Sequence, residues 1–424
     1  MILTIRPSHL KGVIGVPGSK SHTIRGVICG ILANGTSVLS YPLESDDTKA
    51  AIGAAKALGA DVTKFADRWE IHGCGGKFKN PEKVIDMLNS GTSLRLFFSA
   101  AARQDFPVAF DGDASLRSRK MSTLIETLES LGCRCTSNKG KCPVSICGPV
   151  KSGRAVVDGE SSQFLSSLLF ALPFAEGEFD LDLPFLNEKP YVGITLSWLD
   201  FLGIKYEVSP DWLHWHIKGN QSISSFTRAI PADFSTAAFP LAAGVLAGEE
   251  LKITNLDFND CQGDKVVFDH FKAMGASLEY GDVLTIKGGI KLKPGIFDLN
   301  ATPDALPIMA VAAAFAEGET RLVNAPQARI KETDRIAVMA QELTKMGVEL
   351  KELPDGLIIY GTGKVQGSKE LNSHGDHRIV MSLAVAALAA EGESAIKDAE
   401  CAGVTYPGFF ETFSKLGADF KLSE

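Results

Sequence analysis

The hydrophobic and polar positions of the chain follow one pattern that occurs six times. In each copy an apolar helix ends at a Leu or Met before a glycine, and two strands joined by a turn follow. Subtracting the positions of successive marker glycines gives spacings of 70 to 73 residues. Such regular spacing predicts an internal structural repeat. The marker glycines are Gly59, Gly132, Gly203, Gly275, Gly347 and Gly417.

Each copy also contains a second helical segment that is apolar on nearly all sides. A helix of this kind is predicted to be buried, and several of these segments begin at Ser, Thr or Asp, which cap helix N-termini. The repeating unit is therefore predicted to be a βαβαββ-like arrangement of two helices and several strands. The buried helices are predicted over residues 21–35, 91–104, 161–177, 233–248, 304–318 and 376–392.

The sixth copy stops after its first strand, and the N-terminal segment ILTIRPS is predicted to complete it. The chain would then cross between its halves twice, near residues 12–16 and near 220–231, where GNQSISSFTRAIP is typical of a linker. We expect an α/β fold of two lobes with three units each, joined by a two-strand hinge. One lobe would comprise residues 13–229 and the other residues 1–12 with 230–424, and the active site would lie in the cleft between them.

The composition is that of a globular protein, with 424 residues of which 45% are hydrophobic and 22% charged. A net charge of −8 argues against general nucleic-acid binding, although it leaves room for a small basic pocket. No apolar run reaches the roughly 18 residues of a membrane span, and MILTIRPSHLKG is interrupted too soon for a signal peptide. Eight cysteines without a secretory signal indicate reduced thiols and a cytoplasmic location.

A cluster of cysteines raises the alternative of a metal site. Its spacing matches no common zinc pattern and no histidine lies nearby, so we expect strand cysteines packed as small hydrophobic residues. The histidines of HGDHR would supply only one face of a metal site, and we expect no metal. The residues concerned are Cys133, Cys135, Cys142, Cys147, His374 and His377.

Polar residues gather at the predicted starts of the buried helices. Helix N-termini carry unpaired N–H groups and positive potential, so they favour bound anions. Lys20 and Arg25 are cations at such a start, where their charge has the unfavourable sign, and we expect a bound anion to be their partner. Ser21, Ser161 and Asp304 also suit simple capping. A ring of anion sites would contain Lys20, Ser21, Arg25, Asn89, Ser90, Gly91, Thr92, Arg95, Ser161, Ser162, Gln163, Asp304, Asp376, His377 and Arg378.

Two further basic clusters occur. In RIKETDR, Lys331 and Arg335 are four residues apart on one face of a predicted helix, where like charges repel unless an anion lies between them. Glu332 beside them is a candidate acid or base; an exposed, self-paired helix is the alternative. The cluster in SLRSRKM is either functional or a solvated loop, and its members are Arg117, Arg119 and Lys120.

The motifs PGSKSHTIR, NSGTSLR, SLRSRKM, SSQFLSSLL, EKPYVGITL, PDALP, RIKETDR, GDHRIVM and TYPGFFE occur in an order that covers nearly the whole chain. Together they resemble the family of 5-enolpyruvylshikimate-3-phosphate synthases, the 3-phosphoshikimate 1-carboxyvinyltransferases. The resemblance implies the enolpyruvyl transferase fold, an inside-out α/β barrel in each lobe. It implies transfer of the enolpyruvyl group of phosphoenolpyruvate to the 5-hydroxyl of shikimate 3-phosphate, through a tetrahedral intermediate. This is a shikimate-pathway step of aromatic amino acid biosynthesis, carried out by a monomer without metal or organic cofactor.

The resemblance also implies roles for individual residues. Asp304 would be the base for the 5-hydroxyl and Glu332 would move the proton at C3, with Lys20 as a third catalytic residue. Shikimate 3-phosphate would be bound by Lys20, Ser21, Arg25, Ser161, Ser162, Gln163, Tyr191, Asp304 and Lys331. Phosphoenolpyruvate would be bound by Lys20, Gly91, Arg119, Gln163, Arg335 and Arg378.

Four positions depart from the family's commonest pattern. Glu188 stands where a serine usually precedes KPY, near the expected shikimate phosphate, and we expect its carboxylate to point away from that phosphate. Val404 precedes TYP where some members have a lysine, so glyphosate sensitivity does not follow from the resemblance. Gln327 and Lys120 replace a usual asparagine or histidine and a usual proline.

Three rival functions remain at this stage. A UDP-N-acetylglucosamine enolpyruvyltransferase shares the fold, but its arginine loop generally carries a cysteine, and DGDASLRSRKM has none. A non-catalytic phosphometabolite-binding protein would explain the cations but not Glu332 and Asp304. An RNA-binding or RNA-modifying protein of related repeat architecture disagrees with the acidic charge balance.

Overall fold

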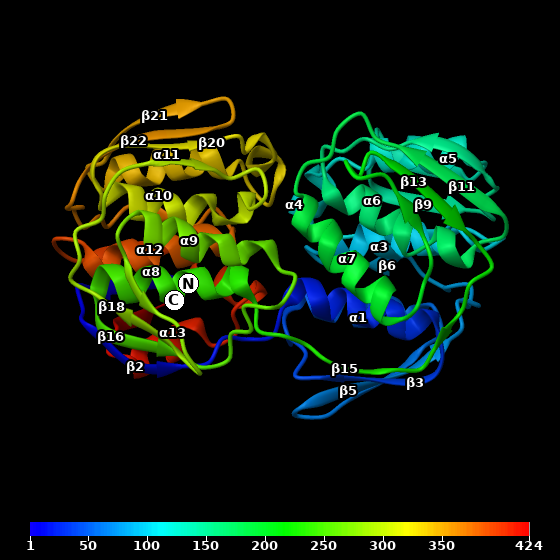
Figure 1. Ribbon diagram of the computed structural model, residues 1–424, viewed down its shortest axis with the longest axis horizontal. Coiled ribbons are helices and arrows are strands. Elements are labelled where there is room, and N and C mark those ends of the chain that lie inside the picture. Colours follow the sequence, from blue (N-terminus) through cyan, green and yellow to red (C-terminus); the bar gives the residue numbers. More distant parts are fainter. Residues whose placement is uncertain (424) are drawn as a thin grey trace. The chain divides into compact units, whose positions relative to one another are not determined.

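The computed structural model describes residues 1–423 and divides the chain into two compact units (Figure 1). Unit 1 comprises residues 1–17 and 232–424, and unit 2 comprises residues 18–231. The buried apolar side chains form one cluster within each unit. Each unit therefore has its own hydrophobic core, as an independently folding domain does.

Unit 2 contains helices and strands in alternation. Its helices are α1 (Lys20–Leu32), α2 (Asp46–Ala57), α3 (Gly91–Ala101), α4 (Ala114–Ser118), α5 (Ser122–Ser130), α6 (Ser162–Leu169), η1 (Leu172–Phe174) and α7 (Lys189–Phe201). Its strands are β3 (Ala33–Ser40), β4 (Asp61–Lys64), β5 (Arg68–Cys74), β6 (Ile85–Asp86), β7 (Val108–Asp111), β8 (Arg134–Asn138), β9 (Lys141–Cys147), β10 (Gly153–Val156), β11 (Glu178–Asp182), β12 (Glu207–Val208), β13 (His214–Lys218), β14 (Ile223–Ser224) and β15 (Thr227–Ala229).

Unit 1 repeats this alternation. Its helices are α8 (Phe234–Ala247), η2 (Gly263–Lys265), α9 (Val266–Ala273), η3 (Pro303–Ala305), α10 (Leu306–Ala314), η4 (Pro326–Ile330), α11 (Arg335–Lys345), α12 (His377–Ala389), η5 (Ala399–Val404) and α13 (Phe409–Lys415). Its strands are β1 (Ile2–Arg6), β2 (Leu10–Ile14), β16 (Gly248–Ile253), β17 (Ser277–Glu279), β18 (Leu284–Lys287), β19 (Ile296–Asp298), β20 (Glu317–Val323), β21 (Glu349–Leu353), β22 (Gly356–Thr362), β23 (Leu371–Asn372), β24 (Ser394–Lys397) and β25 (Asp419–Ser423).

The predicted repeat is visible in the sheets. Within residues 1–423 the strands form six sheets, and each begins with a parallel pair that continues into two antiparallel strands. The orders β6-β7-β9-β8, β10-β11-β13-β12 and β19-β20-β22-β21 follow the same plan. One set of helices is buried: every residue of α10 is inaccessible, and α8 and α12 pack against it. The prediction of an α/β repeat with buried apolar helices is confirmed.

The first strand of the chain completes the last repeat. β1 lies between β24 and β25, with Ile2 opposite both Lys397 and Ser423. Both partner strands are antiparallel to β1, and Leu3 and Ile5 are fully buried. The prediction that ILTIRPS completes the sixth copy is confirmed.

The stretch predicted as a linker has a structural role. β14 and β15 pair in parallel with β3, so residues 223–229 supply the first strand of the first repeat. β2 likewise pairs in parallel with β16 and supplies the first strand of the fourth repeat. The unit boundaries therefore fall at Pro17 and Pro231 rather than at residues 12 and 229. The Ser-rich composition indicated a linker, although Ile223 within it is buried in the sheet.

The ends of the buried helices differ from the prediction. α1 ends at Leu32, and the segment predicted over residues 161–177 is divided into α6 and η1. Pro173 lacks the N–H that an uninterrupted helix requires, which accounts for the break. Among the described residues no helix has the length and apolar character to cross a membrane.

Candidate active site

Three carboxylates surround one buried arginine in unit 1. Arg335 begins α11, and its side chain is 1% exposed. Its guanidinium donates hydrogen bonds to Asp376 Oδ2 at 2.7 Å, Asp304 Oδ1 at 2.8 Å and Glu332 Oε2 at 2.5 Å. We call this group the acid–arginine cluster; its members are Asp304, Lys331, Glu332, Arg335, Asp376 and Arg378.

Asp304 has the largest number of cationic neighbours in this cluster. It lies in η3, 18% exposed, with Arg378 Nη2 3.0 Å from Oδ2 and Lys331 Nζ 3.8 Å from Oδ1. Burial alone would raise the pKa of Asp304, but the charges of Arg378, Lys331 and Arg335 outweigh it and hold the pKa well below its usual range. Asp304 is therefore ionised and stabilised as a carboxylate.

Asp376 was predicted only as a polar residue at a helix start. It caps α12 by accepting the N–H of Arg378 at 2.8 Å, and Thr333 Oγ1 donates to it at 3.1 Å. Burial would raise the pKa of Asp376, but the charge of Arg335 overrides this effect and lowers it. The sequence signal for this role was the Asp at the cap position of an apolar helix, immediately before His377 and Arg378.

Lys331 and Arg335 do not share one helix face, so that prediction was wrong. η4 ends at Ile330, and α11 begins at Arg335 after the cap residue Asp334, whose side chain accepts the N–H of Ala337 at 3.0 Å. An aspartate with this geometry starts a helix rather than continuing one. The two cations are instead brought together by Asp304, which binds both.

In unit 2, Lys20 has a carboxylate partner that the sequence did not indicate. Its Nζ lies 2.9 Å from Asp47 Oδ2, in the first turn of α2, and both side chains are largely buried. Helix α1, which begins at Lys20, is capped by Ser19 and not by Ser21: the Ser19 side chain accepts the N–H of His22 at 3.4 Å. Lys20 thus has Asp47 as a partner in the protein alone, and its pairing with a bound anion stays a prediction.

Arg25 joins α1 to α7. Its Nε donates to Thr195 Oγ1 at 2.9 Å, and its two other nitrogens donate to the carbonyl oxygens of Ser21 at 3.1 Å and Tyr191 at 3.0 Å. Thr195 Oγ1 in turn donates to Ser166 Oγ of α6 at 2.9 Å. Arg25, Ser21 and Tyr191 were all predicted as ligands of one substrate, and the structure brings them together.

The start of α6 holds the predicted serines. Ser161 caps the helix by accepting the N–H of Gln163 at 3.4 Å. Ser162 Oγ donates to Glu188 Oε2 at 2.8 Å. The side chain of Glu188 is 1% exposed and turned toward Ser162. Its expected orientation away from a bound phosphate stays a prediction.

Gln163 connects this helix start to the next one. Its amide nitrogen donates to Thr92 Oγ1 at 3.1 Å, and its amide oxygen accepts from Arg95. Thr92 and Arg95 both lie in α3. The starts of α3 and α6 therefore lie side by side, as the helix-start pattern predicted.

The basic cluster at the end of α4 has side chains that point in different directions. Its members are Arg117, Arg119 and Lys120. Arg119 is 8% exposed and donates to Asn89 and, at 3.3 Å, to Ser115. It lies so close to Gly91 that a Cβ there would be 2.8 Å from Nη1. Arg117 instead pairs with Asp111 at the surface, and Lys120 with Glu160. Only Arg119 of the three belongs with the predicted site residues.

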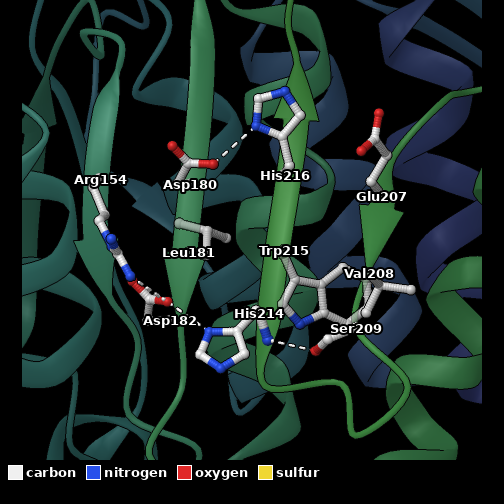
Figure 2. Close-up of a pocket in the computed structure, with 10 residues that line it drawn as sticks. All are labelled: Arg154, Asp180, Leu181, Asp182, Glu207, Val208, Ser209, His214, Trp215 and His216. Carbon is white, nitrogen blue, oxygen red and sulfur yellow. Dashed lines mark hydrogen bonds and ion pairs between the residues drawn. The ribbon is translucent and has the colours of Figure 1, made fainter.

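Figure 2 shows a shallow surface depression of about 530 Å³ on the sheet formed by β10, β11, β13 and β12. His214 Nδ1 lies 2.7 Å from Asp182 Oδ1, and His216 Nδ1 lies 2.9 Å from Asp180 Oδ1. Hydrogen bonds from Arg154 and His214 lower the pKa of Asp182 to about 2. The two imidazole rings extend toward opposite ends of the strand. The residues drawn there include none of those predicted for substrate binding.

The cysteine cluster of unit 2 contains free thiols. Cys133 precedes β8, Cys135 lies within it, and Cys142 and Cys147 lie in β9. Burial raises the pKa of Cys133 and Cys135 to about 12 and that of Cys142 to about 11. Thiols with these pKa values stay protonated near neutral pH. Cys133 and Cys142 lie in the hydrophobic core and Cys135 packs against it, as predicted for small hydrophobic residues, whereas Cys147 accepts a hydrogen bond from Arg134 at 3.2 Å.

Comparisons with known proteins identify the family. Residues 5–413 match the family model described as EPSP synthase (3-phosphoshikimate 1-carboxyvinyltransferase). The chain is 45% identical to a 3-phosphoshikimate 1-carboxyvinyltransferase of Acetivibrio thermocellus and 38% identical to one of Methanococcus vannielii, each match covering 100% of both chains.

Solved structures give the same result. An EPSP synthase from Acinetobacter baumannii superposes with a TM-score of 0.83 at 29% identity, with 100% of both chains covered. The enolpyruvyl transferase NikO from Streptomyces tendae, at 19% identity and a TM-score of 0.79 over 99% of this chain and 98% of its own, shares the fold. The full-length match to the family model and to relatives at 45% identity establishes that the chain belongs to the EPSP synthase family, the 3-phosphoshikimate 1-carboxyvinyltransferases.

Proposed function

We propose that the chain carries out its reaction with the charged side chains described above. The reaction transfers the enolpyruvyl group of phosphoenolpyruvate to the 5-hydroxyl of shikimate 3-phosphate, releasing phosphate, in the shikimate pathway. The acid–arginine cluster is the observation that carries the assignment of roles. It combines cations suited to an anionic substrate with carboxylates suited to proton transfer, all paired with Arg335 or Asp304 at 3.8 Å or less.

Arg335 and Arg378 are proposed to bind the carboxylate and phosphate of phosphoenolpyruvate. Guanidinium groups suit both anions because they donate two parallel hydrogen bonds in a plane. Both arginines now contact Asp304, so a bound substrate would compete with that carboxylate for them. Losing these contacts would raise the pKa of Asp304, because the positive charges of the two arginines lower it. Binding of phosphoenolpyruvate would thus convert a weak base into a stronger one.

Asp304 is then proposed to accept the proton of the 5-hydroxyl as its oxygen attacks C2 of phosphoenolpyruvate. Glu332, in its protonated form, donates a proton to C3, which becomes a methyl group in the tetrahedral intermediate. In the second step Glu332 takes a proton back from that methyl group while the C2–O bond to phosphate breaks. Glu332 is 18% exposed beside Arg335, which leaves its carboxyl group accessible to a ligand. The second step thus returns Glu332 to its protonated form, and the proton that Asp304 accepted leaves with the phosphate, so the protons balance over the two steps.

The residues of unit 2 are proposed to hold the substrates for this chemistry. Lys20 would exchange its contact with Asp47 for one with substrate, which accounts for a cation at a helix start. Lys331 and Asp304 of unit 1 would touch the shikimate hydroxyls. Shikimate 3-phosphate would be bound in unit 2 by Lys20, Ser21, Arg25, Ser161, Ser162, Gln163 and Tyr191, and phosphoenolpyruvate by Lys20, Gly91, Arg119 and Gln163.

We further propose a monomer acting in the cytoplasm. Support for the location comes from the eight cysteines, all of which are free thiols. Support for the monomer comes from the family resemblance.

Ligand stabilisation tests the proposed substrate. A ligand that binds only the folded protein raises the melting temperature by mass action. We expect shikimate 3-phosphate to raise it, and phosphoenolpyruvate to raise it further when both are present. UDP-N-acetylglucosamine serves as the control for the rival transferase. Stabilisation by UDP-N-acetylglucosamine and none by shikimate 3-phosphate would contradict the proposal.

A further inference from the structure

Glu188 places a carboxylate at the start of α6. It is the cap residue of α7, and its carboxylate Oε2 accepts hydrogen bonds from Ser162 Oγ at 2.8 Å and from the backbone N–H of Ser162 at 3.4 Å. The side chain is 1% exposed. A hydroxyl and an N–H at a helix N-terminus are the donors that an anion seeks, and here a side chain of the chain itself takes them.

The backbone of Glu188 is strained. Its φ of +54° lies in the left-handed region, which a residue with a long side chain seldom adopts. Strain of this kind persists where surrounding contacts impose it. The hydrogen bonds to Ser162, and the bond from the N–H of Tyr191 to the Glu188 carbonyl at 3.0 Å, are contacts of that kind.

The neighbouring residues are the ones proposed to bind shikimate 3-phosphate. Tyr191 lies in the first turn of α7, which Glu188 caps, and its carbonyl accepts from Arg25. Ser161 caps α6 directly before Ser162. Helices α6 and α7 pack against one another (Figure 1). The carboxylate of Glu188 is thus built into the group of donors assigned to the substrate.

We propose that Glu188 is a specificity-determining residue, whose carboxylate competes with the phosphate of shikimate 3-phosphate for the donors at the start of α6. The inference rests on the proposed function. A carboxylate and a phosphate dianion cannot share the hydroxyl of Ser162, and like charges at close range repel. Binding of the phosphate therefore requires Glu188 to leave Ser162. The chain binds this phosphate less tightly than it would with a neutral residue at position 188.

Substitution of Glu188 tests the competition. Glu188→Gln keeps the size and one acceptor oxygen but removes the charge, and Glu188→Ser removes the whole carboxyl group. The dissociation constants of shikimate 3-phosphate and of shikimate, which lacks the phosphate, are measured by calorimetry at one pH. We expect both variants to bind shikimate 3-phosphate at least tenfold more tightly than the unmodified chain. Shikimate binding should change less than twofold.

A matched control separates this effect from a general change of charge. Glu207 lies in the same unit, on the exposed face of β12 (Figure 2), so Glu207→Gln removes one negative charge at a distance from α6. It should change neither dissociation constant. Unchanged or weaker binding of shikimate 3-phosphate by both Glu188 variants, with binding by the unmodified chain intact, would overturn the inference alone. No binding by the unmodified chain would overturn the proposed function and the inference with it.

Discussion

Arg335 makes three of its contacts to carboxylates that come from separate segments of the chain. Counting Lys331 and Arg378 with it, the acid–arginine cluster holds three formal positive charges and, with Glu332 ionised, three formal negative charges. A buried group of this kind is stable only if each charge keeps its partners. An anionic substrate that enters must therefore replace a carboxylate at an arginine, and that exchange couples binding to the readiness of Asp304 to accept a proton.

Replacing the carboxyl group of Glu332 by an amide should lower the turnover rate without weakening the binding of shikimate 3-phosphate. Glu332→Gln is expected to lower kcat by at least a hundredfold, because an amide cannot donate or accept the C3 proton. The dissociation constant of shikimate 3-phosphate should stay within a few-fold of the original. Steady-state kinetics and calorimetry measure the two quantities. Glu319→Gln, at an exposed surface ion pair with Arg321, is the control and should change neither. Near-normal kcat in Glu332→Gln would remove Glu332 from the proton-transfer role.

Asp376 should govern acid stability. Folding lowers the pKa of Asp376, so its ionised form stabilises the fold. This contribution is complete when the pH is above the pKa of the unfolded chain, about 3.9, and is lost as the pH falls toward the lower pKa of the folded chain. Asp376→Asn should lower the free energy of unfolding by about 3–5 kcal/mol at pH 7, because it leaves Arg335 short of a buried partner. The difference between the two proteins should shrink below about pH 4. Urea unfolding at a series of pH values tests this, and a pH-independent difference would contradict it.

At the residue scale, the sequence predicted which charged side chains lie together better than it predicted their hydrogen-bond partners. The members Asp304, Lys331, Glu332 and Arg335 were all predicted, and the structure brings them together. The partners of the unit 2 cations were missed because they come from distant segments: Thr195 is 170 positions from Arg25. The hydrogen bond between Glu188 and Ser162 was not predicted, because the orientation of Glu188 depends on a left-handed backbone that no local pattern revealed.

At the scale of elements, the closeness of helices to sheets depends on residue size at single positions. Gly30 in α1 has no side chain, and a Cβ there would lie 2.9 Å from Ile71 Cδ1 and 3.0 Å from its Cγ2. Ile71 lies in β5, is fully buried and is β-branched, so it has little freedom to move aside. Gly53 in α2 has nothing within 4 Å of the corresponding position.

These two glycines should respond oppositely to the same substitution. Gly30→Ala is expected to destabilise the protein by about 1–3 kcal/mol through overpacking. Gly53→Ala should stabilise it by about 0.5–1 kcal/mol, because alanine is the better helix former. Urea unfolding monitored by circular dichroism gives both values. A loss of stability in Gly53→Ala, or none in Gly30→Ala, would contradict this account of the packing.

The repeat made the helices and strands predictable. The pairing of strands that lie far apart in the sequence was only partly predictable. Strand β1 was assigned correctly because the sixth copy visibly lacked a strand. Strands β2 and β15 were not assigned to the fourth and first copies, since their partners β16 and β3 lie far along the chain. The helix predicted across RIKETDR failed because Asp334 caps a new helix there.

At the scale of the whole molecule, the two units should be distinguishable in unfolding. All four tryptophans of the chain, Trp69, Trp198, Trp212 and Trp215, lie in unit 2. Each unit has its own core, so each is expected to unfold as a cooperative unit. Asp376→Asn should therefore shift the transition seen by circular dichroism more than the one seen by tryptophan fluorescence. Equal shifts by both probes would show that the units unfold together.

Transfer of an enolpyruvyl group to shikimate 3-phosphate by this family member releases inorganic phosphate, so phosphate release reports the reaction itself. The protein is mixed with phosphoenolpyruvate and shikimate 3-phosphate, and inorganic phosphate is followed over time. We expect stoichiometric release that requires both substrates and falls at least a hundredfold in Glu332→Gln. No release with shikimate 3-phosphate, together with release when UDP-N-acetylglucosamine replaces it, would contradict the account.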